Sequence, residues 1–372
     1  MPDVPLIQTE KHYKYLDSAR GIAALMVFVS HYTGYVYNFK NPKNIGVFCI
    51  LFNGNDAVSF FFVLSGFVLS FKYIVGNKPL DLRKFYVSRF FRLFPPYFII
   101  VTASALWIFQ GRITMQVLKD LFVFNKFEFW QEAILFRYNN KFWCPGWTLT
   151  IEMMCSFLIP FFVALALKNK RFINYFLFTI LILGSSIIFS FHFLLGILVC
   201  CHYSMITSDE FKKTKWHKYR YLILAAAIVL FSLRQINRIS ELGSTLIYLM
   251  TFTCIDYFVL SAIGSFIFLV AILRSKTAQR ILENKLLVFL GKISYAVYLV
   301  HLLVIGITVK FIGGPLDRPF SVRYLILFTV VCFTSVFITS TLFYYLIERP
   351  FISIGKRISA RMKPSLIIQR DV

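Results

Sequence analysis

The chain has 372 residues, of which 58% are hydrophobic and 19% aromatic, and its formal net charge is +23 at pH 7. A soluble domain of this length is not so apolar, so the composition indicates a membrane protein. The Lys and Arg residues lie in clusters between apolar runs, as the positive-inside rule predicts, and we therefore expect no nucleic-acid partner. The seven cysteines form no spaced pair of pairs, so we expect neither disulfides nor a metal site.

Apolar runs long enough to cross a bilayer recur along the whole chain, which predicts an all-α fold and a polytopic membrane helix bundle. With the N-terminus in the cytoplasm, most of the 40 Lys and Arg fall on the cytoplasmic side. About ten spans then return the C-terminus to the cytoplasm as well. We expect residues 1–350 to form the membrane domain and residues 351–372 a basic cytoplasmic tail. The predicted spans are 16–38, 46–72, 91–110, 148–167, 172–189, 191–206, 220–233, 245–273, 287–311 and 322–347.

The first predicted span carries two ionisable residues, Arg20 and His31, in an otherwise apolar run. On a helix, eleven positions turn through about 1100°, so the two side chains lie within about 20° of one face and about 16 Å apart along the axis. Ionisable residues inside a membrane helix are expensive to bury and are functional candidates by default.

Two carboxylates lie at a similar predicted depth to His31 in other spans. Asp56 is expected about ten residues inside the second span, and Glu152 about five residues inside the fourth, from ~1.5 Å of rise per residue. A carboxylate beside an imidazole fixes its tautomer and raises its basicity, as in a general base, so His31, Asp56 and Glu152 form a predicted catalytic group. The alternative is that each carboxylate pairs with a buried arginine or caps a helix.

A second set of candidates is cationic and lies at the predicted inner surface. Arg89 and Arg92 are three residues apart in RFFRLFPPY and share a helix face, and arginines presented in this way suit phosphate oxygens. Arg20 and Lys292 belong to the same set. The alternative is that the positive-inside bias accounts for all of them.

The segment GKISYAVYLVH, residues 291–301, combines polar groups with an apolar span. Gly291 allows a close helix approach, while Ser294 and Tyr295 add hydroxyls that either act on a substrate or only hydrogen-bond neighbouring helices. The longest predicted outer connection, 111–147, carries several tryptophans, and we expect an interfacial helix there.

Six motifs now stand in order along the chain: the Arg20–His31 pair, FFVLSGF (61–67), RFFRLFPPY (89–97), WTLTIE (147–152), GKISYAVYLVH (291–301) and YLIERP (345–350). Together they resemble the acyltransferase-3 family of integral membrane O-acyltransferases, from about residue 15 to 350. The resemblance implies that Arg20 and His31 are the essential Arg and His. The WSLxxE-type element of the family matches Trp147, Thr148 and Glu152, with Thr where Ser is common.

The resemblance also implies transfer of an acyl group, usually acetyl from cytoplasmic acetyl-CoA, to a hydroxyl of an extracytoplasmic or lipid-linked carbohydrate. We expect a multi-pass protein of the bacterial inner membrane, in contact with lipid, with no tightly bound cofactor. His31 would act as base, and the cations would hold the CoA phosphates. Candidate oxyanion donors or relay residues are Ser65, Ser294 and Tyr295. A transporter or flippase of a lipid-linked saccharide, without acyl chemistry, is the alternative function.

Overall fold

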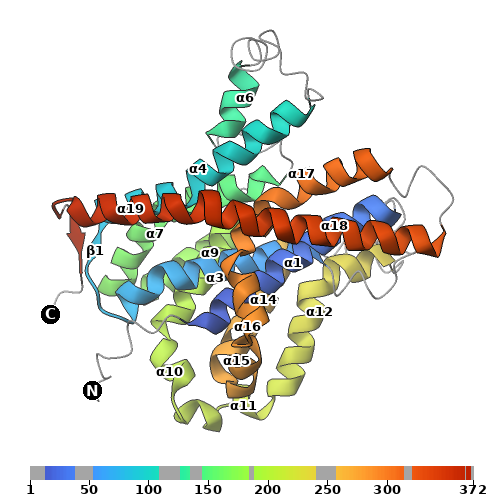
Figure 1. Ribbon diagram of the computed structural model, residues 1–372. Helices are drawn as coiled ribbons and strands as arrows, with labels where there is room; N and C mark the ends of the chain where they lie inside the picture. Colours follow the sequence, from blue (N-terminus) through green and yellow to red (C-terminus); the bar gives the residue numbers. More distant parts are fainter. Residues whose placement is uncertain are drawn as a thin grey trace. The chain divides into compact units, whose positions relative to one another are not determined.

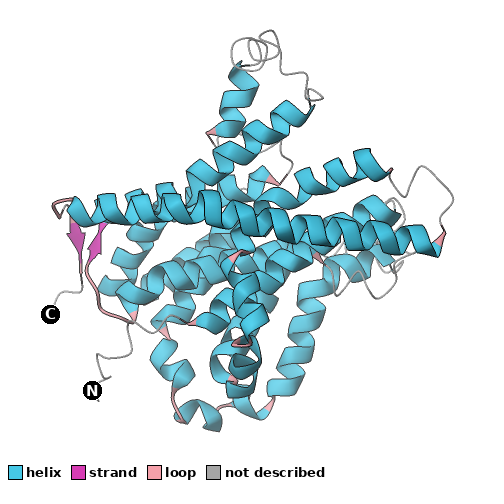
Figure 2. Ribbon diagram, viewed as in Figure 1, coloured by secondary structure: helices cyan, strands magenta, loops and turns pink. Residues whose placement is uncertain are grey.

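The computed structural model describes residues 13–37, 53–108, 126–134, 145–183, 188–239, 257–313, 321–364 and 366–369. The chain divides into two compact units, one formed by 1–80, 158–294 and 368–372, and the other by 81–157 and 295–367. The described residues are helical apart from turns and one two-stranded sheet of β1 (Leu80–Asp81) and β2 (Ile367–Ile368), as Figure 2 shows. The predicted all-α fold class is therefore confirmed for this part of the chain.

Within the described residues, six helical segments are long and apolar enough to cross a membrane, which makes this a multi-pass membrane protein. Helices also lie at the other four predicted spans, but these are shorter or less apolar, so the number of ten and the cytoplasmic termini stay predictions. The first part of the predicted span 245–273 lies outside the described residues. The six segments are α3 (Gly54–Ile74), α4 (Leu82–Ile108), α7 (Gly146–Lys168), α14 (Tyr257–Arg274), α17 (Ser294–Ile312) and the run Val322–Arg361; the other four helices are α1 (Lys14–Tyr37), α8 (Arg171–Leu183), α9 (Ile188–Cys201) and α12 (Arg220–Ile239).

The first unit contains a close helix pair, α3 and α9, that is built on glycines (Figure 1). A Cβ added at Gly66 would lie 2.1 Å from the carbonyl oxygen of Phe193, and one at Gly196 would lie 2.1 Å from that of Val63. Small residues let membrane helices approach until their backbones touch. The glycine of the FFVLSGF motif is thus explained by packing.

A second glycine contact joins α1 to α16 (Lys285–Lys292) in the same unit. A Cβ at Gly21 would lie 2.6 Å from the backbone nitrogen of Gly291, and one at Gly291 would lie 2.4 Å from the backbone of Asp17. The close approach expected of Gly291 is confirmed.

The prediction of one continuous helix over 287–311 was wrong, because α16 ends at Lys292 and α17 begins at Ser294, with Ile293 between them at φ −95° and ψ 5°.

The first unit also contains the antiparallel pair of α12 and α14, in which α14 packs on α3 and α9. Short helices connect α9 to α12, and another follows α14. They are α10 (Tyr203–Thr207), the 3₁₀ turn η5 (Glu210–Lys213), α11 (Lys215–Lys218) and α15 (Lys276–Leu282).

The second unit contains α4, α6 (Lys126–Ala133), the first part of α7, α17, and the long helix made of α18 (Val322–Phe343), the π-helical turn η7 (Tyr344–Glu348) and α19 (Arg349–Arg361). α19 packs on α4, where Gly355 faces the ring of Phe91. The helix does not end at 347 as predicted, but continues to Arg361. Pro350 has no N–H for the carbonyl of Leu346, which explains the widened turn before it.

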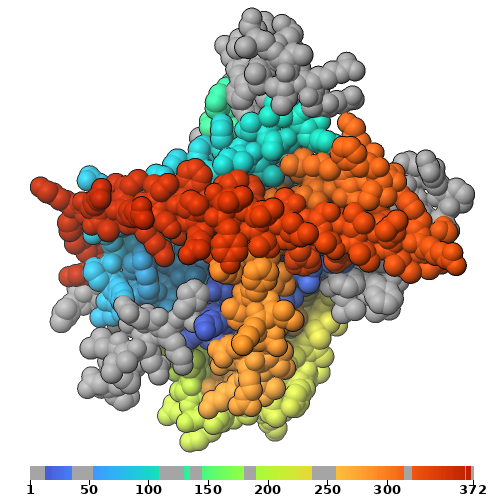
Figure 3. Space-filling view, in the orientation of Figure 1, coloured from blue at the N-terminus to red at the C-terminus, as the bar shows by residue number. Residues whose placement is uncertain are grey.

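One face of α18 is strongly apolar and exposed, and in Figure 3 this orange-to-red helix lies at the surface. Ile326, Leu327 and Val330 are all more than half exposed. Such an exposed apolar face on a long helix suits contact with lipid.

In the predicted outer connection, α6 carries Trp130, which stacks on Phe98 of α4, so the helix expected there is present.

Candidate functional site

The two essential residues implied by the family resemblance, Arg20 and His31, lie on a single helix, α1. Arg20 is half-buried and donates a hydrogen bond to the carboxylate of Asp17 over 3.3 Å, one turn earlier. His31 is half-buried two turns before the end of the helix. The prediction that the two residues share one helix is therefore confirmed, while their positions across a membrane stay a prediction.

Asp56 is buried but lies in the first turn of α3, so its predicted position ten residues inside a span was wrong. The helix begins at Gly54 because Asn53 caps it: its side-chain oxygen accepts the backbone N–H of Asp56 over 3.3 Å. The amide nitrogen of Asn53 also donates to the carboxylate of Asp56. The helix-capping alternative considered for Asp56 is therefore part of the observed geometry.

A buried polar network extends from this cap toward α12. The side chain of Gln235 donates to Asn53 over 3.2 Å, and both residues are buried. The guanidinium of Arg234, also on α12, is close enough to act electrostatically on the carboxyl of Asp56. The sequence reasoning found Asp56 but missed its partners, which come from a helix about 180 residues away along the chain.

The start of α3 is also in contact with α1, immediately beside His31. A Cβ added at Gly54 would lie 2.8 Å from the Cβ of Ser30 and 2.9 Å from its hydroxyl oxygen. His31 and Asp56 thus flank a tight helix contact in the same unit. One helical turn further along α3, the hydroxyl of Ser59 lies 3.2 Å from the Nε2 atom of the buried His192 on α9.

The other candidates of the first unit lie around the contact between α1 and α16. Gly21 and Gly291 touch, and they are the sequence neighbours of Arg20 and Lys292. Lys292 is exposed at the end of α16. Two predicted phosphate ligands therefore flank one backbone contact. Ser294 is buried at the start of α17, and Ser65 is half-buried on α3.

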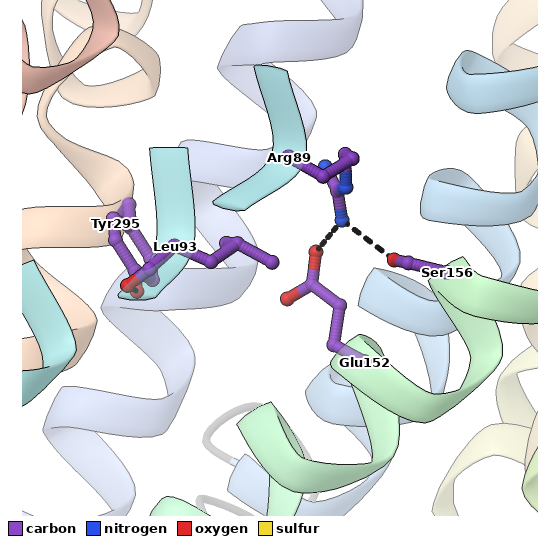
Figure 4. Close-up of polar contacts among 5 residues, drawn as sticks. All are labelled: Arg89, Leu93, Glu152, Ser156 and Tyr295. Carbon is purple, nitrogen blue, oxygen red and sulfur yellow. Dashed lines mark hydrogen bonds and ion pairs between the residues drawn. The ribbon is translucent and has the colours of Figure 1, made fainter. Parts of the chain in front are cut away.

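In the second unit, Arg89 of α4 forms an ion pair with Glu152 of α7 (Figure 4). One terminal nitrogen of Arg89 donates to the Glu152 carboxylate over 2.8 Å and to the hydroxyl of Ser156 over 2.9 Å. Ser156 follows Glu152 by four residues, so both side chains share a face of α7. That spacing was the signal by which Ser156 could have been found. The alternative considered for Glu152, pairing with a buried arginine, is realised here.

Arg89 keeps hydrogen-bonding capacity beyond these two contacts. Its Nε–H is buried and has no hydrogen-bond partner among the described residues. Arg89 and Ser156 also line an open cavity of about 430 Å³ whose other walls are apolar or aromatic. These walls include Phe90, Phe94 and Phe157. The ion pair therefore lies at the edge of an apolar groove, with a guanidinium N–H still able to donate.

Three further polar residues join helices of this unit. The hydroxyl of Tyr295 donates to the backbone carbonyl of Leu93 over 2.8 Å, as Figure 4 shows. The hydroxyl of Tyr298 contacts that of Thr148, which in turn donates to the carbonyl of Pro145 over 2.9 Å at the start of α7. Tyr295 and Tyr298 therefore have structural partners in α4 and at the start of α7.

The structure thus brings the candidates together as two groups. Arg20, His31, Asp56, Ser65, Lys292 and Ser294 belong to the first unit, and Arg89, Arg92, Glu152 and Tyr295 to the second. Arg92 is exposed on α4, unlike Arg89 one turn before it. Among the described residues, no group of three or more His, Cys, Asp or Glu side chains is arranged to hold a metal ion.

Comparison with known proteins identifies one family. The family model of an acyltransferase domain matches residues 13–345 of this chain. The YrhL protein of Bacillus subtilis (strain 168), provisionally named a peptidoglycan O-acetyltransferase, is 27% identical over 172 residues. That match covers 42% of this chain and 25% of the length of YrhL. No solved structure matches the chain.

The family match contains the Arg20–His31 helix, the α3 cap and the Arg89–Glu152 pair within one continuous range. The matched range also contains five of the six motifs found in order along the sequence and ends at the first residue of the sixth, YLIERP, and it confirms the prediction of an acyltransferase. The chain belongs to the acyltransferase-3 family.

Proposed function

We propose that this protein is a membrane O-acyltransferase that moves acetyl from cytoplasmic acetyl-CoA to a hydroxyl of an extracytoplasmic surface carbohydrate. The host membrane in this proposal is the inner membrane of a bacterium. The observation that carries the proposal is the pair Arg20 and His31 on α1, in a chain matched by the acyltransferase family over residues 13–345. The name of the YrhL relative supports a glycan acceptor and an acetyl group.

His31 acts as the general base in this proposal. It removes the proton of the acceptor hydroxyl as that oxygen attacks the thioester carbonyl carbon. A carbon–oxygen bond forms, the carbon–sulfur bond breaks, and the proton passes to the departing CoA thiolate. Asp56 is the carboxylate assigned to orient His31, because the two residues flank the contact between Ser30 and Gly54.

Arg20 and Lys292 are assigned to the phosphates of CoA. Their backbones are brought together by the contact between Gly21 and Gly291, which presents two cations from different helices to one ligand. Arginine holds phosphate through two parallel N–H groups, and lysine adds a point charge.

Arg89 is assigned to the acyl-carrying end of the donor. Glu152 and Ser156 fix its guanidinium, while Nε–H remains available for a carbonyl or oxyanion. The adjoining groove is apolar enough for the pantetheine arm or the acyl group. Arg92, which is exposed on the same helix, is assigned to a contact with a CoA phosphate.

Ser65, Ser294 and Tyr295 remain candidates for oxyanion stabilisation or for a covalent acyl relay. Tyr295 would first have to release the carbonyl of Leu93. Incubation with radiolabelled acetyl-CoA but without acceptor separates the two routes, because only a relay leaves label on the protein.

The test of the proposed function has two parts. Purified protein in lipid nanodiscs is incubated with labelled acetyl-CoA, and free CoA is measured with and without a cell-wall or polysaccharide acceptor. Acceptor-dependent release of CoA supports the proposal. Mass spectrometry of surface glycans from cells with and without the gene then identifies the sugar that loses one acetyl unit. Glycan transport without any thioester consumption would assign the protein to the transporter alternative.

A further inference from the structure

A second cavity, of about 350 Å³, lies in the first unit at the end where α12 begins and α14 ends. None of its lining residues is among those assigned to acyl transfer, and it is lined by α12, α14 and the segment 211–217. In Figure 3 the yellow-green segment between α9 and α12 forms part of the surface of this unit. The cavity therefore opens beside residues that none of the motifs includes.

The mouth of this cavity is cationic. Lys212, Arg220 and Arg274 line it together with His217. Arg220 donates to the backbone carbonyl of His217 over 3.0 Å, and Arg274 donates to that of Ser208 over 3.0 Å. Neither arginine forms an ion pair within the part of the chain that the structure describes, so both guanidinium groups can still pair directly with an anion.

The acidic groups nearby offset only part of the positive charge at this mouth. Asp209 pairs with Lys212 over 2.7 Å, and both side chains are well exposed. Glu210 is the next residue and is also exposed. Asp209 is thus paired with Lys212 and lies within electrostatic range of Arg274, while the guanidinium groups of Arg220 and Arg274 donate hydrogen bonds to backbone carbonyls.

The titration of His217 is consistent with a positive local potential. Desolvation lowers the pKa of its imidazole, and the charges of Arg220, Arg274 and Lys212 lower the pKa further. The positive charges of Arg220, Arg274 and Lys212 therefore all act on the imidazole of His217 at the cavity mouth. An anion bound there would relieve their mutual repulsion.

The floor of the cavity is apolar and comes from two membrane helices. It is formed by Ile223 and Leu224 of α12 and by Ile267, Val270 and Ala271 of α14. The length and composition of α14 suit a membrane span that ends at Arg274, which places the mouth at the membrane–water boundary. An apolar floor beneath a cationic mouth suits a ligand with an anionic head and a hydrocarbon tail.

Aromatic side chains flank the same mouth. The guanidinium of Arg274 lies 5.2 Å from the ring centre of Phe211, and that of Arg220 lies 4.6 Å from the ring centre of Tyr221. Trp216 is 39% exposed and Tyr221 is 73% exposed. Exposed Trp and Tyr beside basic residues are typical of the level of lipid headgroups.

We propose that this cavity binds one anionic glycerophospholipid, with its phosphate held by Arg220, Arg274 and Lys212 and an acyl chain along the floor of α12 and α14. A zwitterionic lipid binds less well, because its own cation meets the same three positive side chains. A free nucleotide or phosphate has no group for the apolar floor.

The test measures binding of dioctanoyl-phosphatidylglycerol to the full chain in neutral detergent by native mass spectrometry. Dioctanoyl-phosphatidylcholine, inorganic phosphate and CoA serve as comparison ligands. The proposal expects tighter binding of phosphatidylglycerol than of phosphatidylcholine, and no displacement by phosphate or CoA at matched concentrations. Equal binding of the two lipids, or displacement by CoA, would overturn it.

Two variants locate the site. Arg220→Gln is expected to weaken phosphatidylglycerol binding by about tenfold, since it removes one charge-assisted contact. Arg280→Gln is the matched control, because Arg280 is exposed on α15 and lies outside the cavity lining. Ala271→Phe fills the floor without changing charge and is expected to weaken binding of the lipid as well. Unchanged binding in both cavity variants, or equal loss in Arg280→Gln, would contradict the proposal.

Discussion

Replacement of Glu152 by Gln isolates the charge of the partly buried ion pair in the second unit. The side chains of Arg89 and Glu152 are 11% and 21% exposed, and their N···O distance is 2.8 Å. Glu152→Gln keeps an oxygen at that place but leaves the guanidinium without an opposite charge. Two unit charges about 4 Å apart attract by roughly 4 kcal/mol at an effective dielectric constant of 20, and residual solvent contact reduces this.

We therefore expect Glu152→Gln to lower the free energy of unfolding by about 2–3 kcal/mol, because the positive charge stays buried while its partner is lost. The double variant Arg89→Gln with Glu152→Gln should recover part of this loss, since two neutral amides can hydrogen-bond. Arg92→Gln is the matched control, because Arg92 is exposed one turn away. We expect it to change stability by less than about 0.5 kcal/mol.

Denaturant titration in detergent, followed by tryptophan fluorescence, measures these differences for the wild type, for the single variants Glu152→Gln, Arg89→Gln and Arg92→Gln, and for the double variant. The reasoning predicts that the double variant is more stable than Glu152→Gln alone. If the effects of the two single variants simply added, the pair would not be coupled, and the account of Glu152 as the partner of Arg89 would be refuted.

Three further predictions concern the first unit. Gly291→Ala should destabilise the protein by about 1–3 kcal/mol, because the new Cβ would lie 2.4 Å from the backbone of Asp17; a denaturation midpoint equal to that of the wild type would contradict the contact. His217→Gln should reduce the loss of thermal stability as pH falls from 7.5 to 5.5. The pKa of His217 is lowered in the folded state, so on acidification below about pH 6.5 the unfolded state binds the proton before the folded state does. Protonation therefore favours unfolding of the wild type, and the variant lacks this effect. Identical pH profiles would refute that reasoning. Arg20→Lys should weaken acetyl-CoA binding measured by calorimetry while thermal stability is kept, and unchanged affinity would remove Arg20 from the phosphate contact.

Local sequence pattern predicted those parts of the fold that depend on neighbours along the chain. Arg20 and His31 share one helix because the run between them is uninterrupted and apolar, and Gly291 is at a close contact because it has no side chain. The predicted position of Asp56 along its helix was wrong. The stretch before Asn53 is apolar, so the sequence pattern did not indicate that Asn53 caps α3 and that the helix begins there. Periodicity also gave no sign of the break at Ile293.

The sequence did not predict which side chains from distant parts of the chain form hydrogen bonds or ion pairs with one another. Glu152 was expected beside an imidazole, but its observed partner is Arg89, which the sequence assigned to phosphate. Gln235 reaches Asn53 from α12, about 180 residues away. Hydrogen bonds of this kind are set by tertiary packing, which depth along a span does not determine. Only Ser156, four residues after Glu152 on the same helix face, carried a local signal.

The most direct measurement for the central claim is acetyl-CoA turnover by His31→Gln compared with His192→Gln. His192 is the matched control, because it is a buried histidine of the same unit whose observed partner is the hydroxyl of Ser59. With both variants folded, the account predicts that His31→Gln loses about 10²- to 10⁴-fold of the acceptor-dependent rate, as expected for a general base, and that His192→Gln stays within a few-fold of the wild type. Wild-type turnover in His31→Gln would contradict the account.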